Sequence, residues 1–229
     1  MASVTLSRTA RTLITGGLDQ IGQELARINT RDGRRLTLVD RSEDGLLALR
    51  EALIQDGAPH PLIISEDLSA PGAADDVYEA CQFYRLMGPE GTAITRMINL
   101  LEVPAESAAD EDPAELFTAR TSTLLGLCQR FVPDLIRRGE ARVLNILVAY
   151  GPRQEPFSSL FDQARTLLLD LSHRLNLQGG NRLTVNTLCY HADSLFIQAP
   201  AAPDEAPPDL YPPACTPAAI ARWAHQVMA

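Results

Sequence analysis

Strand-like and helix-like segments alternate along almost the whole of this 229-residue chain, and that alternation constrains its fold most strongly. Short apolar runs predict six strands, which are Arg11–Thr15, Arg35–Asp40, His60–Ser65, Thr92–Leu101, Arg142–Ala149 and Arg182–Cys189. Helical spacing of apolar residues predicts six helices, which are Ile21–Arg31, Glu43–Gln55, Ala73–Met87, Glu115–Arg138, Pro156–Leu177 and Pro217–Met228. Strands that alternate with helices form parallel sheets covered on both faces, so we expect an α/β domain.

A glycine turn, Thr15-Gly16-Gly17-Leu18-Asp19-Gln20-Ile21-Gly22, follows the first expected strand. Such a turn lets the backbone approach a pyrophosphate, although the same turn also serves simple strand–helix packing. The turn and the alternation together predict a Rossmann-type doubly wound parallel sheet of about six strands, with helices on both faces. We expect a single domain over residues 1–229, with an extended Pro/Ala-rich loop at about 199–217.

The composition excludes several classes of partner and site. The formal net charge of −9 disfavours nucleic acid or an anionic membrane as the main partner. No apolar run approaches the roughly 20 residues that span a bilayer. The four cysteines and four histidines show no metal-ligand spacing, and widely separated cysteines are typical of reduced thiols. We therefore expect a cytoplasmic protein without a metal site.

From Thr12 to about Ala221 the chain resembles the short-chain dehydrogenase/reductase family. The glycine turn falls where that family has Thr-Gly-x-x-x-Gly-x-Gly, with Gln20 in place of the middle glycine. The family's Tyr-x-x-x-Lys motif falls on Phe161-Asp162-Gln163-Ala164-Arg165. The resemblance implies a Rossmann-type fold and NAD(P)-dependent oxidoreductase ancestry, with a divergent catalytic site.

The resemblance implies a cofactor site with NAD as the candidate cofactor, although no cofactor is certain. The implied cofactor-binding residues are Gly16, Gly17, Gly22, Asp40, Asp67 and Asn99. Asp40 ends the second expected strand, where an acidic residue usually binds the ribose hydroxyls of NAD. Against this, the family's Asn-Asn-Ala-Gly falls on Asn99-Leu100-Leu101-Glu102, whose larger side chains are poor substitutes. The alternative is that the two aspartates are only turn residues.

Four family positions that carry catalysis are all altered. The family's asparagine, serine, tyrosine and lysine fall on Arg120, Val148, Phe161 and Arg165. All 20 basic residues are arginine, so the chain holds no lysine elsewhere. Hydride transfer to a carbonyl needs a proton donor, which phenylalanine and valine lack, and arginine does not deprotonate in proteins. The resemblance therefore predicts a catalytically inactive member, with no intact catalytic residue.

Three functional hypotheses remain open. The first is a non-catalytic subunit, regulator or scaffold that acts through association. The second is an NAD-dependent oxidoreductase whose site is repurposed around Tyr150, Tyr190, His191 or Arg165, and the third is an NAD(H)-sensing protein. For Tyr150 and His191 the alternative is a tyrosine at a strand end and an exposed loop histidine. Gln20 and Leu100 filling the cofactor groove would favour the first hypothesis, and an open groove facing Asp40 the other two.

The two long helices, residues 115–138 and 156–177, are the candidate dimer interface. The family uses the equivalent helices, and here they carry apolar residues that are Leu124, Leu127, Phe131, Leu160, Leu167, Leu168 and Leu171. The family's seventh strand, which follows the last helix, is expected to be missing, which would weaken the usual tetramer. We expect a homodimer or a heterodimer, for which an active family member or a pathway enzyme is the candidate partner.

Overall fold

The computed structural model describes residues 10–87, 93–103, 112–139, 141–149, 157–191, 194–198 and 216–228. Tyr150 and residues 199–215 of the expected Pro/Ala-rich loop lie outside these ranges. In the described part of the chain, no helix is long and apolar enough to cross a membrane.

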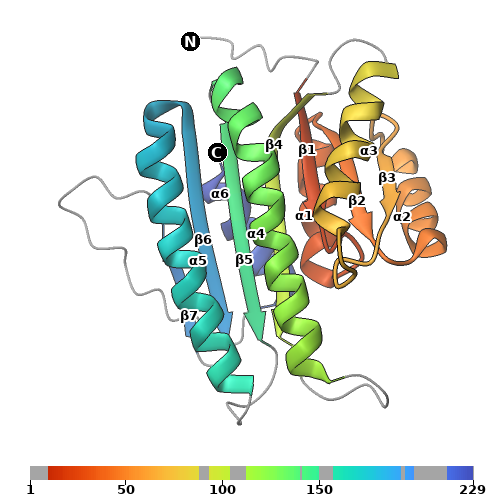
Figure 1. The fold of residues 1–229 in the computed structure, drawn as a ribbon. Helices are drawn as coiled ribbons and strands as arrows, with labels where there is room; N and C mark the ends of the chain where they lie inside the picture. Colours follow the sequence, from red (N-terminus) through yellow and green to blue (C-terminus); the bar gives the residue numbers. More distant parts are fainter. Residues whose placement is uncertain are drawn as a thin grey trace.

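A seven-stranded sheet forms the centre of the molecule, in the order β3-β2-β1-β4-β5-β6-β7 (Figure 1). The strands are β1 (Ala10–Thr15), β2 (Arg35–Asp40), β3 (Leu62–Ser65), β4 (Ala93–Val103), β5 (Ala141–Ala149), β6 (Leu183–His191) and β7 (Ser194–Gln198). Strands β1 to β6 are parallel, whereas β7 pairs antiparallel with β6. Because β1 lies between β2 and β4, the strand order reverses there, and ligands of doubly wound sheets bind at such a point.

Helices cover both faces of the sheet (Figure 1). They are α1 (Gln20–Arg31), α2 (Glu43–Gln55), α3 (Ala73–Met87), α4 (Pro113–Arg138), α5 (Phe157–Gly179) and α6 (Pro217–Val227). Residues of α3, α4 and α5 pack on one face, and residues of α1, α2 and α6 pack on the other. Each strand therefore has apolar side chains on both sides, as expected of a covered parallel sheet.

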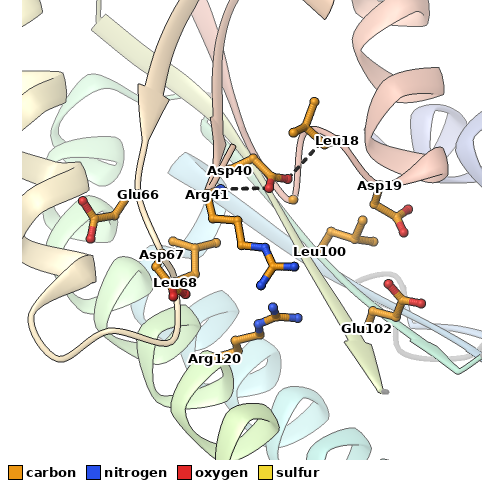
Figure 2. A pocket seen from close by; sticks show the side chains of 11 residues that line it. Leu18, Asp19, Asp40, Arg41, Glu66, Asp67, Leu68, Leu100, Glu102 and Arg120 are labelled. Atoms are coloured by element: carbon orange, nitrogen blue, oxygen red, sulfur yellow. Dashed lines mark hydrogen bonds between the residues drawn. The ribbon is translucent and has the colours of Figure 1, made fainter. Parts of the chain in front are cut away.

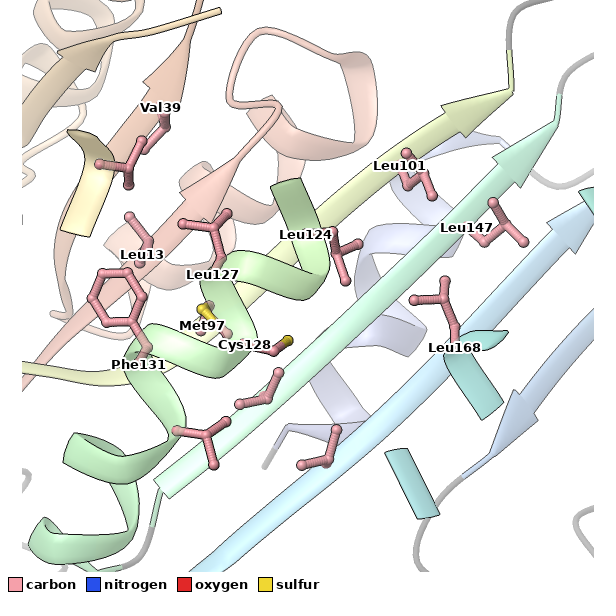
Figure 3. Close-up of a cluster of buried hydrophobic side chains, with 14 of the residues drawn as sticks. Leu13, Val39, Met97, Leu101, Leu124, Leu127, Cys128, Phe131, Leu147 and Leu168 are labelled. Atoms are coloured by element: carbon pink, nitrogen blue, oxygen red, sulfur yellow. The ribbon is translucent and has the colours of Figure 1, made fainter. Parts of the chain in front are cut away.

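Two apolar cores lie on the two faces of the sheet. We call the first the α5-side core; it lies between the sheet and α3–α5 (Figure 3) and includes Leu13, Met97, Leu124, Leu127, Phe131, Leu147, Phe161 and Leu168. We call the second the α6-side core; it lies beneath α1, α2 and α6 and includes Ile14, Ile21, Leu25, Leu46, Ile98, Leu144, Val148, Tyr190 and Ile220. Successive residues of a strand point to opposite faces, which assigns neighbours in β5 to different cores.

The six predicted strands and their parallel arrangement are confirmed, and the six predicted helices lie within a few residues of their expected bounds. Strand β7 was not predicted. It occupies the edge beside β6 and precedes α6, with His191 opposite Ser194 in the hairpin register. The prediction of about six parallel strands is therefore confirmed, and β7 adds an antiparallel seventh strand at the edge of the sheet.

Candidate ligand pocket and the family's catalytic positions

A pocket of about 270 Å³ opens where β1, β2, β3 and β4 end, beside the N-terminus of α1 (Figure 2). The residues that line it are Gly16, Leu18, Asp19, Asp40, Arg41, Glu66, Asp67, Leu68, Leu100, Glu102 and Arg120. Five of these residues are carboxylic acids and two are arginines. The pocket lies at the reversal of strand order, where a doubly wound sheet binds its ligand.

Two glycines of the turn are required by packing alone. A Cβ on Gly22 would lie 2.1 Å from the carbonyl oxygen of Gly16, so α1 can approach the turn only with glycine there. Gly16 has a φ of +69°, and a Cβ on it would lie 3.1 Å from Cβ of Leu100. Because strand–helix packing accounts for both glycines, the glycine pattern by itself does not indicate a bound phosphate.

Asp40 is held in place by two backbone amides. The Leu18 N–H donates to Oδ2 over 3.0 Å, and the Arg41 N–H donates to Oδ1 over 2.8 Å (Figure 2). Gly17 N–H also donates to the Val39 carbonyl over 3.1 Å, which ties the turn to the end of β2. The carboxylate thus faces the pocket from the position predicted for a ribose ligand, while each oxygen already accepts one bond.

Asp67, which follows β3, forms one side of the pocket together with Arg41 and Arg120. Ser69 donates to Oδ1 of Asp67 from both its hydroxyl and its backbone N–H, and these bonds lower the pKa of Asp67, with smaller contributions from Arg120 and Arg41. Figure 2 shows both arginine side chains extending toward the middle of the pocket. Arg120, which the resemblance aligned with the family's asparagine, therefore lines this pocket.

The opposite side of the pocket holds two facing carboxyl groups, Asp19 and Glu102. Asp19 caps α1, because its Oδ1 accepts the Ile21 N–H over 2.7 Å. Burial, then the charge of Asp19 and a hydrogen bond with it, together raise the pKa of Glu102 to about 7, and the charge of Arg120 partly opposes this rise. Burial also raises the pKa of Asp19. The hydrogen bond between the two carboxyl groups lowers the pKa of Asp19 and raises that of Glu102, so Glu102 is the group that the pair keeps protonated.

A dinucleotide does not fit this side of the pocket. The N–H groups of a helix N-terminus bind phosphate when they are free, but here the chain's own carboxylate accepts one of them. Leu100 packs against Gly16 where the backbone would have to approach the diphosphate closely. The residues present suit the ribose end of a nucleotide at Asp40 and oppose its diphosphate at Asp19 and Glu102.

The structure places some of the predicted cofactor-binding residues in the pocket and others behind it. Gly16, Asp40 and Asp67 line the pocket. Gly17 and Gly22 support the turn from behind, and Asn99 is fully buried, where its Nδ2 donates to Oδ1 of Asn145 over 2.9 Å. Gln20 is exposed and does not line the pocket, so the expected crowding comes from Leu100 instead.

The family's serine and tyrosine positions lie on opposite faces of the sheet. Val148 is 1% exposed and packs in the α6-side core with Tyr190. Phe161 is 3% exposed and packs in the α5-side core with Leu147, the neighbour of Val148 in β5. The structure therefore does not bring these two positions to a common site, and each side chain is part of a core.

His191 and Tyr190 are strand residues, so the alternative reading of His191 as an exposed loop histidine was wrong. His191 is 3% exposed at the end of β6, and its ring meets that of Phe161 edge-on, with centroids 5.3 Å apart. Tyr190 points to the other face of the sheet. Burial raises the pKa of Cys189 to about 12, which the nearby charge of Arg165 partly opposes. The third candidate acid, Tyr150, lies outside the described residues.

Sequence reasoning missed three of the pocket's seven charged residues, Asp19, Arg41 and Glu66. Glu102 was noted only as a poor substitute for glycine. One signal was present, because an aspartate directly before a helix is a preferred N-cap. Within the described residues there is no cluster of three or more His, Cys, Asp or Glu that could hold a metal.

The sheet order, the helical layers and the pocket at the strand ends define a Rossmann-type α/β domain. No family model matches the chain. Its sequence is similar to dehydrogenase/reductase SDR family member 7B from Bos taurus, with 27% identity over 160 residues, which is 67% of this chain and 48% of that protein. The chain thus spans about half the length of that relative. This similarity supports a relationship to the short-chain dehydrogenase/reductases.

Solved structures of that family share the fold. A metagenomic short-chain oxidoreductase in complex with NADP superposes with a TM-score of 0.68 at 15% identity, covering 96% of this chain and 90% of its own. The bulky-bulky ketone specific alcohol dehydrogenase from Comamonas testosteroni gives 0.66 at 21% identity, over 80% and 72% of the two chains. A short-chain dehydrogenase from Sphingobium yanoikuyae in complex with NADPH gives 0.64 at 23%, over 81% and 72%.

Proposed function

We propose that this protein is a divergent short-chain dehydrogenase/reductase that does not reduce carbonyls by the family's chemistry and instead acts through association with another protein. One observation carries the proposal: Val148 and Phe161 are buried in two different cores. A group that protonates an alkoxide must reach the substrate within hydrogen-bond distance. Neither side chain carries a proton to donate, and their positions face away from each other.

The residue at the lysine position supports the same conclusion. Arg165 lies one helical turn after Phe161 on α5. In the family, lysine lowers the pKa of the tyrosine. In this chain the tyrosine position holds phenylalanine, which does not titrate, and the lysine position holds arginine, which stays charged. The two substitutions together remove the acid and the group that activates it.

The proposed association needs an exposed apolar surface on the protein. Most apolar residues of α4 and α5 that suggested a dimer interface lie in the α5-side core or pack against it. On α5, Leu167 is 39% exposed and Leu177 is 73% exposed. The end of α3 also exposes Phe83, Leu86 and Met87. We propose a homodimer or heterodimer through α4 and α5, with the end of α3 as the competing surface.

A second candidate function is a nucleotide-dependent enzyme or an NAD(H) sensor. The observation that favours it is the open pocket with Asp40 at the end of β2. Similar structures hold NADP or NADPH, and the similar Comamonas protein is an alcohol dehydrogenase. The carboxyl groups of Asp19 and Glu102 count against this candidate, because they oppose a diphosphate at the helix that would bind it.

Two measurements test the association proposal. Light scattering across a range of concentrations reports the mass, and a reductase assay with NADH or NADPH and aliphatic and aromatic ketones reports turnover. We expect a dimer, or capture of a defined partner, without turnover. The pair L167E/L177E should abolish a dimer formed through α5, while the matched pair F83S/L86E on α3 should leave it intact. Reductase turnover would refute the proposal and favour the second candidate.

A further inference from the structure

The N-terminus of α1 is the place in this fold where an anion is best stabilised. The first N–H groups of a helix have no partner within the helix, and the helix dipole adds a partial positive charge there. In this chain, Asp19 supplies the anion. Its Oδ1 accepts the Ile21 N–H over 2.7 Å, and the nearby Gly22 N–H also favours the ionised form of this carboxylate. The helix N-terminus is therefore already neutralised by a residue of the turn itself.

Glu102 adds a second carboxyl group at the same position. It is the next-to-last residue of β4, and it faces Asp19 across the pocket (Figure 2). Leu100, two residues earlier on the same strand, packs on Gly16 and narrows the approach to the turn. A phosphate placed there would meet two carboxyl groups and a leucine, in place of free amides and space.

We infer that Asp19 and Glu102 are specificity-determining residues that replace the phosphate of a nucleotide with the chain's own carboxyl groups, so that the pocket discriminates against dinucleotides and other diphosphates. This inference is independent of the association proposed above, because it concerns only which ligands the pocket accepts. By this inference, Leu100 and Glu102 in the segment Asn99-Leu100-Leu101-Glu102 oppose a diphosphate at the N-terminus of α1.

Two arginines in the same pocket oppose this effect. Arg41 and Arg120 extend into its middle, on the side where Asp40 and Asp67 lie (Figure 2). Arg120 also acts on the ionisation of Glu102 and of Asp67, so its charge is shared between the two sides. The lining still holds five acids against two arginines, and the acids at the helix N-terminus are the ones a diphosphate would meet.

The test compares three probes, adenosine, ADP and NAD⁺, by calorimetry at pH 8 on the full-length chain. The variants are D19N, E102Q and the double variant, and asparagine keeps the N-cap because it is also a preferred cap. E24Q is the matched control, since it removes a carboxylate from the same helix outside the pocket. Removing the two charges should strengthen binding of ADP and NAD⁺ by about tenfold or more, and change adenosine less than about twofold.

Each outcome decides the inference. Stronger binding of ADP and NAD⁺ by the double variant, with E24Q unchanged, supports it, including the case in which the wild-type protein binds none of the probes. Thermal melting of each variant verifies the fold. The inference is overturned if the folded double variant gains no affinity for ADP or NAD⁺. It is also overturned if the wild-type protein binds ADP more tightly than adenosine, because Arg41 and Arg120 would then define an anion site.

Discussion

The two halves of the sheet's C-terminal edge have diverged in different ways. Along β1 to β4 the edge keeps an open pocket of about 270 Å³ lined by seven charged residues. On β5 and on α5, which covers it, the positions aligned with the family's serine and tyrosine hold Val148 and Phe161, which pack in the two cores. Among the described residues, the β1–β4 half is thus polar and accessible, whereas the two aligned positions of the β5–β6 half are buried in apolar cores.

The residue types of Val148 and Phe161 suit the buried positions that they occupy. A buried serine or tyrosine must find hydrogen-bond partners, whereas valine and phenylalanine stabilise the folded state by burial alone. The charged side chains of the pocket half do not stabilise the folded state in this way, because its carboxyl groups are partly buried and repel one another. Retention of charge in that half is therefore the feature that calls for a functional explanation.

The largest expected effect comes from F161A. Phe161 is buried in the α5-side core, and removing a buried phenylalanine side chain costs about 3–5 kcal/mol. Leu100 borders the open pocket, so L100A should cost roughly 1 kcal/mol, because solvent can enter the space that it leaves. Urea unfolding of both variants measures the contrast. Equal losses would show that the β5–β6 half is no better packed than the pocket half.

Gly22→Ala should be nearly as damaging, although it lies in the pocket half. Its Cβ would meet the Gly16 carbonyl oxygen at 2.1 Å, and such overpacking against backbone costs about 3 kcal/mol. The control is Gly17→Ala, whose Cβ would lie 3.4 Å from Cβ of Leu38 and should cost less than about 1 kcal/mol. Thermal unfolding distinguishes them, and a neutral Gly22→Ala would contradict the structural role assigned to the turn.

Restoring the family's catalytic residues with V148S/F161Y/R165K should not produce a reductase. The new serine would lie in the α6-side core, away from the tyrosine, and burying its hydroxyl should cost about 1–3 kcal/mol. Calorimetric unfolding measures that cost, and NADH or NADPH oxidation with ketones measures activity. V148S and F161Y alone serve as controls for stability. Turnover by the triple variant would show that the two halves still form one active site.

The smallest expected effect is a pH dependence of stability from Glu102. The pKa of Glu102 is raised from 4.5 to about 7 in the folded protein, so the folded state holds its proton more tightly than the unfolded state does. Its contribution to stability therefore falls as the pH rises from about 4.5 to 7. E102Q should be more stable than the wild type by about 1 kcal/mol at pH 8, and equally stable near pH 4, after allowance for solvent screening.

Other acidic and basic side chains line the same pocket as Glu102. They are Asp19 on the turn, Asp40 and Arg41 at the end of β2, Glu66 and Asp67 after β3, and Arg120 on α4. A comparison of E102Q with E24Q across the same pH range isolates the contribution of Glu102. A constant difference between wild type and E102Q at all pH values would contradict the shifted pKa.

Strand β7 and the two catalytic positions show where sequence reasoning stopped. The apolar runs of β1 to β6 are long enough to be recognised as buried strands, and their order along the chain indicated a parallel sheet. Strand β7 is short, with three apolar residues between Ser194 and Gln198, and its antiparallel pairing depends on contact with β6. The core in which each of Val148 and Phe161 is buried depends on how β5 and α5 pack together. Residue spacing along the chain does not determine that packing.

The sequence by itself determined the layered α/β fold and the glycine turn after β1, because these follow from local patterns and residue types. The absence of the family's catalytic residues stays a prediction from the resemblance. Only the tertiary structure decided that Asp19 and Glu102, 83 residues apart in the chain, face each other at the α1 N-terminus. Parallel strands bring their C-terminal ends to one edge whatever their separation in sequence. The composition of that edge is therefore a property of the folded sheet.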